Sequence, residues 1–403
     1  MADDAVGGTS TSTVAVEVAA PKSQPTLCRT LLGLLLAGIP VVIQQTCILL
    51  LSVRTVARVG HTIGTGALAG VALGNLTYNL LGLTLIMAPM IALETYASQA
   101  WGAKRKAEVG LNAQRSLLVA AMLLVPAAVA WLFAEPILRT LGQTEEVSRL
   151  AARYLRGMLP VLPVQVAFES AKRFLYAQTI MWPPVLAAVV AVLVHLLCLG
   201  PIVDALQFDG AACSLLVAHG CMLLTLLLYI LVRRPHDAAT WPGWRLCEVA
   251  RDGRGMKSFI QTSLAGVLLC SFAAADCGRA LRVLGSLGAF SALMREGPCR
   301  LSLAGLVALS EWVFWEVICF RCGTLGTTAL AIHSVAYTIV PLAFMVPLGL
   351  SMALSMGVGC GIEALPSLLC VSLAQLAAAA ARAARAARAA RAARAARAAR
   401  CHR

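Results

Sequence analysis

The chain has 403 residues, of which 59% are hydrophobic and only 13% are charged, and its mean hydropathy is +0.81. A soluble domain carries about a quarter charged residues, so this composition excludes an ordinary soluble protein and predicts an all-α protein that crosses a membrane several times. The formal net charge of +14 does not indicate nucleic-acid binding, because eight of the arginines lie within the last 22 residues.

The chain begins with a polar stretch rich in Ser and Thr, residues 1–29, which we predict to be a disordered cytoplasmic tail. Eight later stretches are long and apolar enough to cross about 30 Å of hydrocarbon. The fourth is the least apolar, because Glu169, Lys172 and Arg173 lie near one end of it. The eight stretches lie at about 30–53, 66–92, 114–134, 153–177, 183–203, 211–232, 302–321 and 328–355.

The basic residues of the connecting loops predict the orientation. With the N-terminus in the cytoplasm, the inner loops carry 12 Lys and Arg residues and the outer loops carry six. Because positively charged loops stay on the cytoplasmic side, we predict a cytoplasmic N-terminus.

Short apolar phrases of the first two spans recur in the last two at nearly constant offsets. An even number of spans separates the copies, so both halves would cross the membrane in the same direction. Transporters built from such parallel repeats bind substrate near the midplane between the halves. We therefore predict a first lobe of six helices (30–235), a cytoplasmic loop (236–300), a partial second lobe of two helices (301–361) and a tail (362–403). The matching phrases are Leu36-Ala37-Gly38 with Leu303-Ala304-Gly305, Gly64–Ala69 with Gly326–Ala331, and Met87-Ala88-Pro89 with Met345-Val346-Pro347.

Two segments do not fit this pattern. Residues 267–300 carry several charged side chains between two Ser-Leu-Ala-Gly phrases, so we predict an insertion in the cytoplasmic loop and not a span. The tail repeats Ala-Ala-Arg, and at 100° per residue its arginines wind round a helix and leave no apolar face. A basic tail lying on anionic lipid is one interpretation, and a low-complexity product of a frameshift is the other.

Two acids in the seventh predicted span are the first candidates for chemistry. Glu311 and Glu316 are about 140° apart round a helix and about 7.5 Å apart along it. Hydrocarbon disfavours the charged form of a carboxyl group, so such a group can hold a proton or a cation in turn, as antiport requires. Trp312 and Trp315 flank the acids and could attract an organic cation or anchor the helix at the interface. The alternative for the acids is a local pair in the headgroup region.

Polar residues of the first two spans are candidates for the wall of a substrate cavity. Gln44 and Gln45 need hydrogen-bond partners in hydrocarbon, so they either join helices or contact substrate. Asn75, Tyr78 and Asn79 in the second span are further cavity candidates.

Two prolines and three ionisable residues complete the candidates. Pro40 and Pro89 each free a backbone carbonyl inside a span and are candidate flexing points, although many membrane helices contain structural prolines. Glu94 is expected to end the second helix near the cytoplasm and to cap it or pair with nearby bases. His195 and His333 are interpreted as packed residues and not as ligands.

Several phrases together resemble the MATE family, the multidrug and toxin extrusion transporters, in its eukaryotic form. The phrase ALETYASQAWGAK at 92–104 resembles the family signature ALDTLCGQAYGAK, and EWVFWE at 311–316 resembles its EWWxFE. Further resemblances are Gly60-His61 with Leu68-Ala69, EPIL with LGQ at 135–143, Arg173-Phe174-Leu175 with Gln178, and WPGW at 241–244. The resemblance covers about residues 30–262 and 301–361. A complete member has two lobes of six helices, so the resemblance implies a chain truncated after about residue 361.

The resemblance implies an all-α helical bundle of the MOP flippase superfamily that works as a secondary active antiporter. It implies export of organic cations across the plasma or vacuolar membrane in exchange for protons, with Na⁺ as the alternative coupling ion, and Glu311 and Glu316 as the proton- and cation-binding residues. Two alternatives stay open: a truncated gene product that does not transport, and a flippase of lipid-linked oligosaccharides. No motif predicts an enzyme, a cofactor or a metal site, and the lone pair Cys319 and Cys322 does not indicate one.

Overall fold

The computed structural model describes residues 27–263 and residues 318, 344, 345, 347 and 349. In this part of the chain all regular structure is helical, which confirms the predicted all-α fold. Glu311, Trp312, Trp315, Glu316 and His333 lie outside the described residues, as do the predicted insertion (267–300) and the Ala/Arg tail (362–403).

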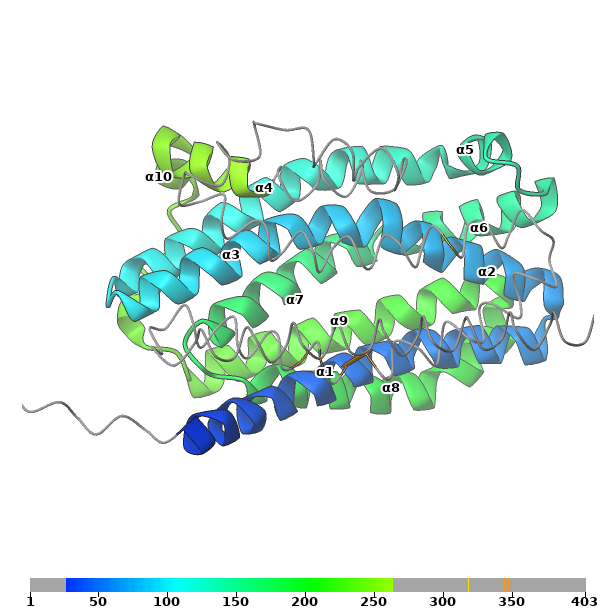
Figure 1. The fold of residues 1–403 in the computed structure, drawn as a ribbon. Helices are drawn as coiled ribbons and strands as arrows, with labels where there is room; N and C mark the ends of the chain where they lie inside the picture. Colours follow the sequence, from blue (N-terminus) through cyan, green and yellow to red (C-terminus); the bar gives the residue numbers. More distant parts are fainter. Residues whose placement is uncertain (1–26, 264–317, 319–343, 346, 348, 350–403) are drawn as a thin grey trace, which may run out of the picture.

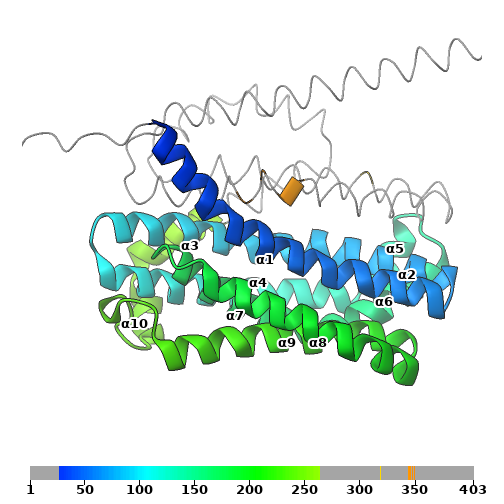
Figure 2. The same cartoon turned by 90° about the horizontal axis from the view of Figure 1, so that it is seen from below.

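The described helices lie alongside one another as an elongated bundle (Figures 1 and 2). In chain order they are α1 (Leu27–Thr62), α2 (Thr65–Thr77), the π-helical segment η1 (Tyr78–Leu83), α3 (Thr84–Gly102), α4 (Lys106–Leu132), α5 (Ala134–Thr140), α6 (Glu145–Met158), α7 (Val161–Tyr176), α8 (Trp182–Leu206), α9 (Phe208–Arg233), the 3₁₀ turn η2 (Ala238–Thr240) and α10 (Leu246–Arg251). Residues 253–263 are also helical.

Five helical stretches of the described residues are long and apolar enough to cross a membrane: 38–62, 65–102, 106–132, 182–206 and 208–233. The second joins α2, η1 and α3 over 38 residues, which is about 57 Å at 1.5 Å per residue and therefore longer than the hydrocarbon layer. Glu94 lies eight residues before the end of α3 at Gly102, so the prediction that it ends this helix is wrong. No Gly or Pro interrupts the chain between the two positions.

The fourth predicted span, 153–177, is not one helix. It falls on α6 and α7, which are separated at Leu159 and Pro160. Pro160 lacks a backbone N–H and lies at the cap of α7, where a helix can begin but cannot continue from the previous one. The prediction of a single span at 153–177 is therefore wrong: this stretch contains the end of one helix, α6, and a second helix, α7, and neither is among the candidate spans of the described residues.

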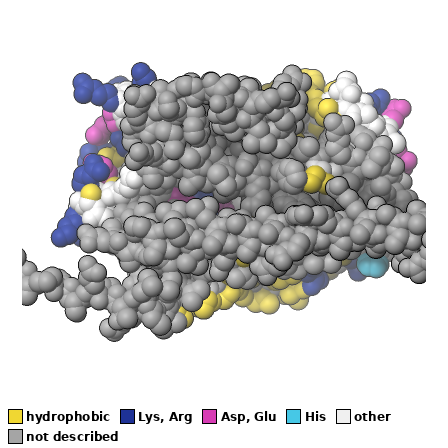
Figure 3. Space-filling view, viewed as in Figure 1, with side chains coloured by type: hydrophobic (Ala, Val, Ile, Leu, Met, Phe, Trp, Pro, Cys, Tyr) yellow, Lys and Arg dark blue, Asp and Glu magenta, His cyan; other side chains and the backbone are white. Residues whose placement is uncertain are grey.

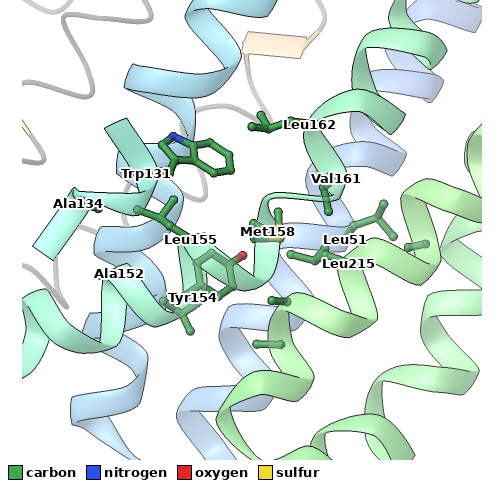
Figure 4. Close-up of a cluster of buried hydrophobic side chains, with 14 of the residues drawn as sticks. Leu51, Trp131, Ala134, Ala152, Tyr154, Leu155, Met158, Val161, Leu162 and Leu215 are labelled. Carbon is green, nitrogen blue, oxygen red and sulfur yellow. The ribbon is translucent and has the colours of Figure 1, made fainter. Parts of the chain in front are cut away.

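Two buried apolar clusters hold the bundle together. The first contains residues of α1 to α7 and of α9, and Figure 4 shows Tyr154 close to Met158, and Leu51 close to Leu215. The second, which we call the inner cluster, joins α1, α3, α4, α7, α8 and α9. The helices α8 and α9 form an antiparallel hairpin that turns at Gln207, and α1 packs on α8.

The surface of the bundle suits a membrane. Leu197, Leu224, Leu231 and Val232 on α8 and α9 are each at least 66% exposed. Apolar side chains line the edge of the molecule where Figure 1 places α8, whereas Lys and Arg gather at the end where α10 lies (Figure 3). An apolar belt between charged ends is the arrangement expected of helices surrounded by lipid.

Candidate functional site

A group of charged side chains is buried on α7. Glu169, Lys172 and Arg173 are 3%, 1% and 5% exposed. Their i, i+3 and i+4 spacing puts all three on one helix face. The Nζ of Lys172 donates to Oε1 of Glu169 at 2.7 Å, and Arg173 forms an ion pair with the other oxygen of the same carboxylate. One acid therefore holds two cations inside the bundle.

The cluster continues onto α3. The Nε of Arg173 lies 3.7 Å from Oε2 of Glu94, and its Nη2 donates to the sulfur of Met87 at 3.5 Å. Glu94, Glu169, Lys172 and Arg173, which we call the charged cluster, comprise two acids and two bases and have no net formal charge. Glu94 pairs with a base, as the sequence predicted, but this base belongs to another helix and lies deep in the lobe.

Gln44 on α1 is a buried amide without a partner among the residues that the structure describes. Its side chain is fully buried, and neither Oε1 nor Nε2 has a hydrogen-bond partner there. It shares a face of α1 with Val41, which packs against Tyr176 and Met181, and with Cys47 and Ile48, which pack against the inner cluster. Gln44 therefore faces the interior of the first lobe.

Gln45 is directed to another side of the bundle. A Cβ added to Gly349 would lie 2.4 Å from Cγ2 of Val42 and 3.2 Å from the carbonyl oxygen of Gly38, so the chain at Gly349 crosses α1 at close range. Gln45 is about 20° from Gly38 and about 60° from Val42 round the helix. Of the two predicted cavity glutamines, Gln45 is thus the one on the side of α1 that meets the later part of the chain.

The predicted cavity residues of the second span make contacts within the lobe. Asn75 accepts a hydrogen bond of 2.7 Å from the hydroxyl of Tyr154, and the ring of Tyr78 lies 5.4 Å from that of Trp131. Tyr78 and Asn79 open η1, where the carbonyl of Asn79 accepts from Thr84 at 3.0 Å. These residues join α2 and η1 to α4 and α6. Pi-helical turns are frequent at functional sites.

The two predicted flexing points lie within continuous helices. Pro40 is inside α1 and Pro89 is inside α3. Figure 2 shows α1 changing direction in its N-terminal part. A proline inside a helix removes one backbone hydrogen bond and favours such a bend.

The segment after α9 is held tightly against the N-terminal part of α4 and the C-terminal end of α7. Gln114 is fully buried; it donates to the carbonyl of Gly243 at 2.8 Å and accepts from the N–H of Arg245 at 2.7 Å. Gln178 accepts from the N–H of Asp237 at 3.1 Å. We call residues 236–245, held in this way, the clasp. Gln178 belongs to one of the family-like phrases and Gln114 to none of them, but neither pattern indicates that these side chains bind the backbone of the later segment.

Two acids of this region are paired with bases of α4. Lys106 donates to Asp237 at 2.5 Å, and this hydrogen bond lowers the pKa of Asp237. The backbone N–H of Gly255 and then the guanidinium of Arg115 lower the pKa of Asp252. These pairs add to the attachment of the segment that leads to the later part of the chain.

No group of three or more His, Cys, Asp or Glu side chains that could hold a metal ion occurs in the residues that the structure describes. Cys319 and Cys322 lie outside the described residues.

Comparison with known proteins shows what this chain is similar to. A sequence model of the MatE family matches residues 40–199. Multidrug and toxin extrusion protein 1 of Danio rerio is 29% identical over 334 residues, which cover 80% of this chain and 48% of that protein. The Homo sapiens protein of the same name is 28% identical over 328 residues, covering 81% and 50%. Protein DETOXIFICATION 37 of Arabidopsis thaliana is 30% identical over 224 residues, covering 55% and 43%.

Solved structures show the same fold. The crystal structure of the eukaryotic MATE transporter AtDTX14 has a TM-score of 0.66 at 19% identity and covers 83% of this chain and 67% of that one. A MATE structure in the bent conformation has a TM-score of 0.53 at 19% identity, covering 81% and 71%. This chain spans about half the length of the curated relatives it matches. Sequence and fold together confirm the resemblance to the MATE family: the family model matches residues 40–199, and the helical bundle has the fold of solved MATE transporters.

Proposed function

We propose that this chain is a MATE-type secondary antiporter that exports organic cations in exchange for protons. The observation that carries the proposal is the match to multidrug and toxin extrusion proteins along 80% of the chain. The helical bundle with apolar sides and charged ends provides the membrane-embedded frame that such transport needs.

The charge balance of the first lobe supports different roles for the two lobes, with the substrate cation and the exchanged proton bound mainly by the second. The charged cluster has no net formal charge, so it exerts little attraction on a cation at a distance. Glu311 and Glu316 in the second lobe would then supply the attraction for the substrate cation and the site for the exchanged proton. Trp312 and Trp315 would contact the cation through their ring faces. Gln45, on the side of α1 that meets Gly349, would line the path between the lobes.

The test is efflux of a fluorescent organic cation, ethidium, from vesicles that contain the full chain and carry an imposed pH gradient. Replacing Glu311 with Gln removes the carboxylate but keeps the shape of the side chain. Loss of a buried charge partner costs about 2–5 kcal/mol, so we expect pH-driven efflux to fall by more than about tenfold.

The matched control is Glu248→Gln, since Glu248 is exposed on α10 and forms only a surface pair with Arg245. The control should transport like the unchanged chain. Equal efflux by E311Q and E248Q would reject the role of Glu311. If the unchanged chain reaches the membrane and moves no ethidium, the antiporter proposal itself is rejected.

A further inference from the structure

Two histidines lie at the same depth on neighbouring helices of the first lobe. His195 is on α8 and His219 is on α9, and each lies twelve residues from Gln207, where the hairpin turns. At 1.5 Å per residue both are about 18 Å from the turn, which is near the middle of a hydrocarbon layer about 30 Å thick. Ionisable side chains at this depth are rare and usually have a function.

Both imidazoles are buried, and the hydrogen bonds around His195 define its tautomer. His195 is 1% exposed, and its Nε2 lies 3.1 Å from Oγ1 of Thr55. The hydroxyl of Thr55 donates its proton to the carbonyl of Leu51 at 2.9 Å, so Thr55 accepts from the N–H at Nε2 of His195. The Nδ1 of His195 is then an unprotonated acceptor, and none of the residues that the structure describes donates a hydrogen bond to it.

His219 has the opposite tautomer. It is 6% exposed, and its Nδ1 lies 2.8 Å from the carbonyl oxygen of Leu215, which can only accept. The proton of the neutral ring is therefore on Nδ1, and Nε2 carries the lone pair. Each ring thus has one nitrogen fixed as a donor by its own surroundings and one nitrogen available for a proton.

Few charged groups act on this pair. On His195 the charged or titratable groups are Arg54 of α1 and His219 of α9. On His219, no charged side chain of α6 or α7 in the described part of the chain acts measurably. Adding a proton to the pair would therefore place a positive charge next to Arg54 without an acid to balance it. When the lobe excludes water, burial disfavours the protonated, charged form of the pair. A conformation that admits water to the histidines removes this penalty and permits protonation.

We propose that His195 and His219 form a proton-binding site in the first lobe, in addition to the acids of the second lobe. A proton delivered by water forms an N–H bond at Nδ1 of His195. When the donor is hydronium, it becomes water; when the donor is a water molecule, it becomes hydroxide. The resulting imidazolium donates at both nitrogens, with Thr55 as the acceptor at Nε2. This inference rests on the proposed antiport function, because it assigns the bound proton to the exchange for an organic cation.

Proton binding can be observed directly and without transport. The full chain, labelled with ¹⁵N-histidine and placed in lipid nanodiscs, is titrated from pH 8 to pH 5, and the signals of His195 are identified by their loss in the variant His195→Gln. We expect Nδ1 of His195 to change from an unprotonated to a protonated signal in this range in the conformation that admits water, where an imidazole titrates near the ordinary histidine value of about 6.5. A signal that stays unprotonated down to pH 5 overturns the proposal.

Coupling to a cation is tested with tetraethylammonium in the same titration. Because linkage is reciprocal, a cation that competes with the proton must move the midpoint of His195 to lower pH, by an amount that corresponds to about fivefold or more in affinity. The control is His61→Gln, which removes an exposed histidine at the end of α1 and should leave the shift unchanged. A midpoint that tetraethylammonium does not move overturns the assignment of this proton to the exchange.

Efflux separates a failure of this inference from a failure of the proposed function. In vesicles, H195Q should lose the response of ethidium efflux to the pH gradient and keep ethidium exchange between equal concentrations, whereas H61Q should keep both. If the unchanged chain shows no efflux and no exchange, the antiporter function fails and the titration still decides whether the site binds a proton. If H195Q keeps the full response to the gradient, the histidine pair is not the coupling site.

Discussion

At the scale of single residues, the charged cluster shows how a membrane lobe can bury four ionisable side chains. Glu169 is the central member because it pairs with both Lys172 and Arg173, whereas the contact of Glu94 with Arg173 is longer, at 3.7 Å. A buried ion pair contributes little net stability, but removal of one partner leaves an uncompensated charge and is strongly destabilising. The acid that serves two cations should therefore matter most.

We predict that Glu169→Gln destabilises the protein by about 3–5 kcal/mol, because two buried cations lose their shared partner. Glu94→Gln should have a smaller effect, since Arg173 keeps Glu169. The measurement is the temperature at which half of the detergent-solubilised protein remains monodisperse. Glu248→Gln is the control, because its exposed pair is worth about 0–1 kcal/mol. Equal losses for the two buried acids would show that Glu169 does not have the central role assigned to it.

At the scale of elements, the second crossing depends on glycines where it meets α4 and α6. A Cβ added to Gly82 in η1 would lie 2.3 Å from Cζ2 of Trp131, and one added to Gly74 in α2 would lie 2.5 Å from Cδ1 of Tyr154. Both rings are almost fully buried and cannot move into open space. Here glycine is required for close packing. Glycine lowers the stability of a helix, and the burial of the large aromatic rings that pack against it offsets this loss.

We predict that Gly82→Ala destabilises the lobe by about 1–3 kcal/mol through overpacking, although alanine favours a helix over glycine by up to about 1 kcal/mol. Gly220 on α9 provides the opposite case, since no atom lies within 4 Å of an added Cβ. Gly220→Ala should therefore be neutral or stabilising. Thermal stability in detergent measures both. A stabilising effect of G82A would contradict the close contact with Trp131.

The sequence predicted the positions of the long apolar helices well, because a helix that crosses hydrocarbon must be long and apolar, and both properties can be read from the sequence. The spans predicted at 183–203 and 211–232 lie within α8 and α9. Three features could not be predicted in this way. The break at Pro160 depends on backbone geometry, η1 depends on packing round Gly82, and the extension of α3 to Gly102 lies outside the hydrocarbon, where hydropathy gives no signal.

The sequence predicted which residue types belong to the candidate site, but it did not predict which way their side chains point. Two adjacent glutamines in a span are equally polar in sequence, but they point 100° apart on a helix. Only the contacts of Val41 and Gly349 with their neighbours distinguish the inward-facing Gln44 from Gln45. His195 was interpreted as a packed residue, and its burial agrees with that. Its unpaired Nδ1 depends on the orientation of Thr55, which a sequence does not show.

At the scale of the whole molecule, the clasp determines how the first lobe is joined to the rest of the chain. Gln114 makes two hydrogen bonds to its backbone, and Gln178 accepts a third. Trp241 adds an edge contact with Phe174, with ring centres 5.7 Å apart. A connection held in this way moves with α4 and α7, so a movement of the second lobe relative to the first must take place beyond residue 245.

The clasp is at full strength near neutral pH. The lowered pKa of Asp237 means that its pair with Lys106 contributes fully above the ordinary aspartate value of about 3.9 and is lost as the pH falls below it. Burial, followed by Arg234, lowers the pKa of His236, so its contribution is complete above about 6.5 and is also lost on acidification. A test of the clasp at pH 7.5 is therefore free of both effects.

We predict that Gln114→Ala loosens the clasp and speeds cleavage by trypsin at three exposed arginines, namely Arg245 at the end of the clasp and Arg251 and Arg254 beyond it. Loss of two hydrogen bonds of about 1 kcal/mol each should raise the population of the open form about 30-fold. Cleavage that follows brief opening should then speed up by a similar factor. Gln207→Ala is the matched control, because Gln207 bonds only to Asp204 at the α8–α9 turn, remote in sequence from these sites. Equal cleavage rates for the two variants would show that the segment is held by the rest of its contacts, and that the lobes could then move about the clasp itself.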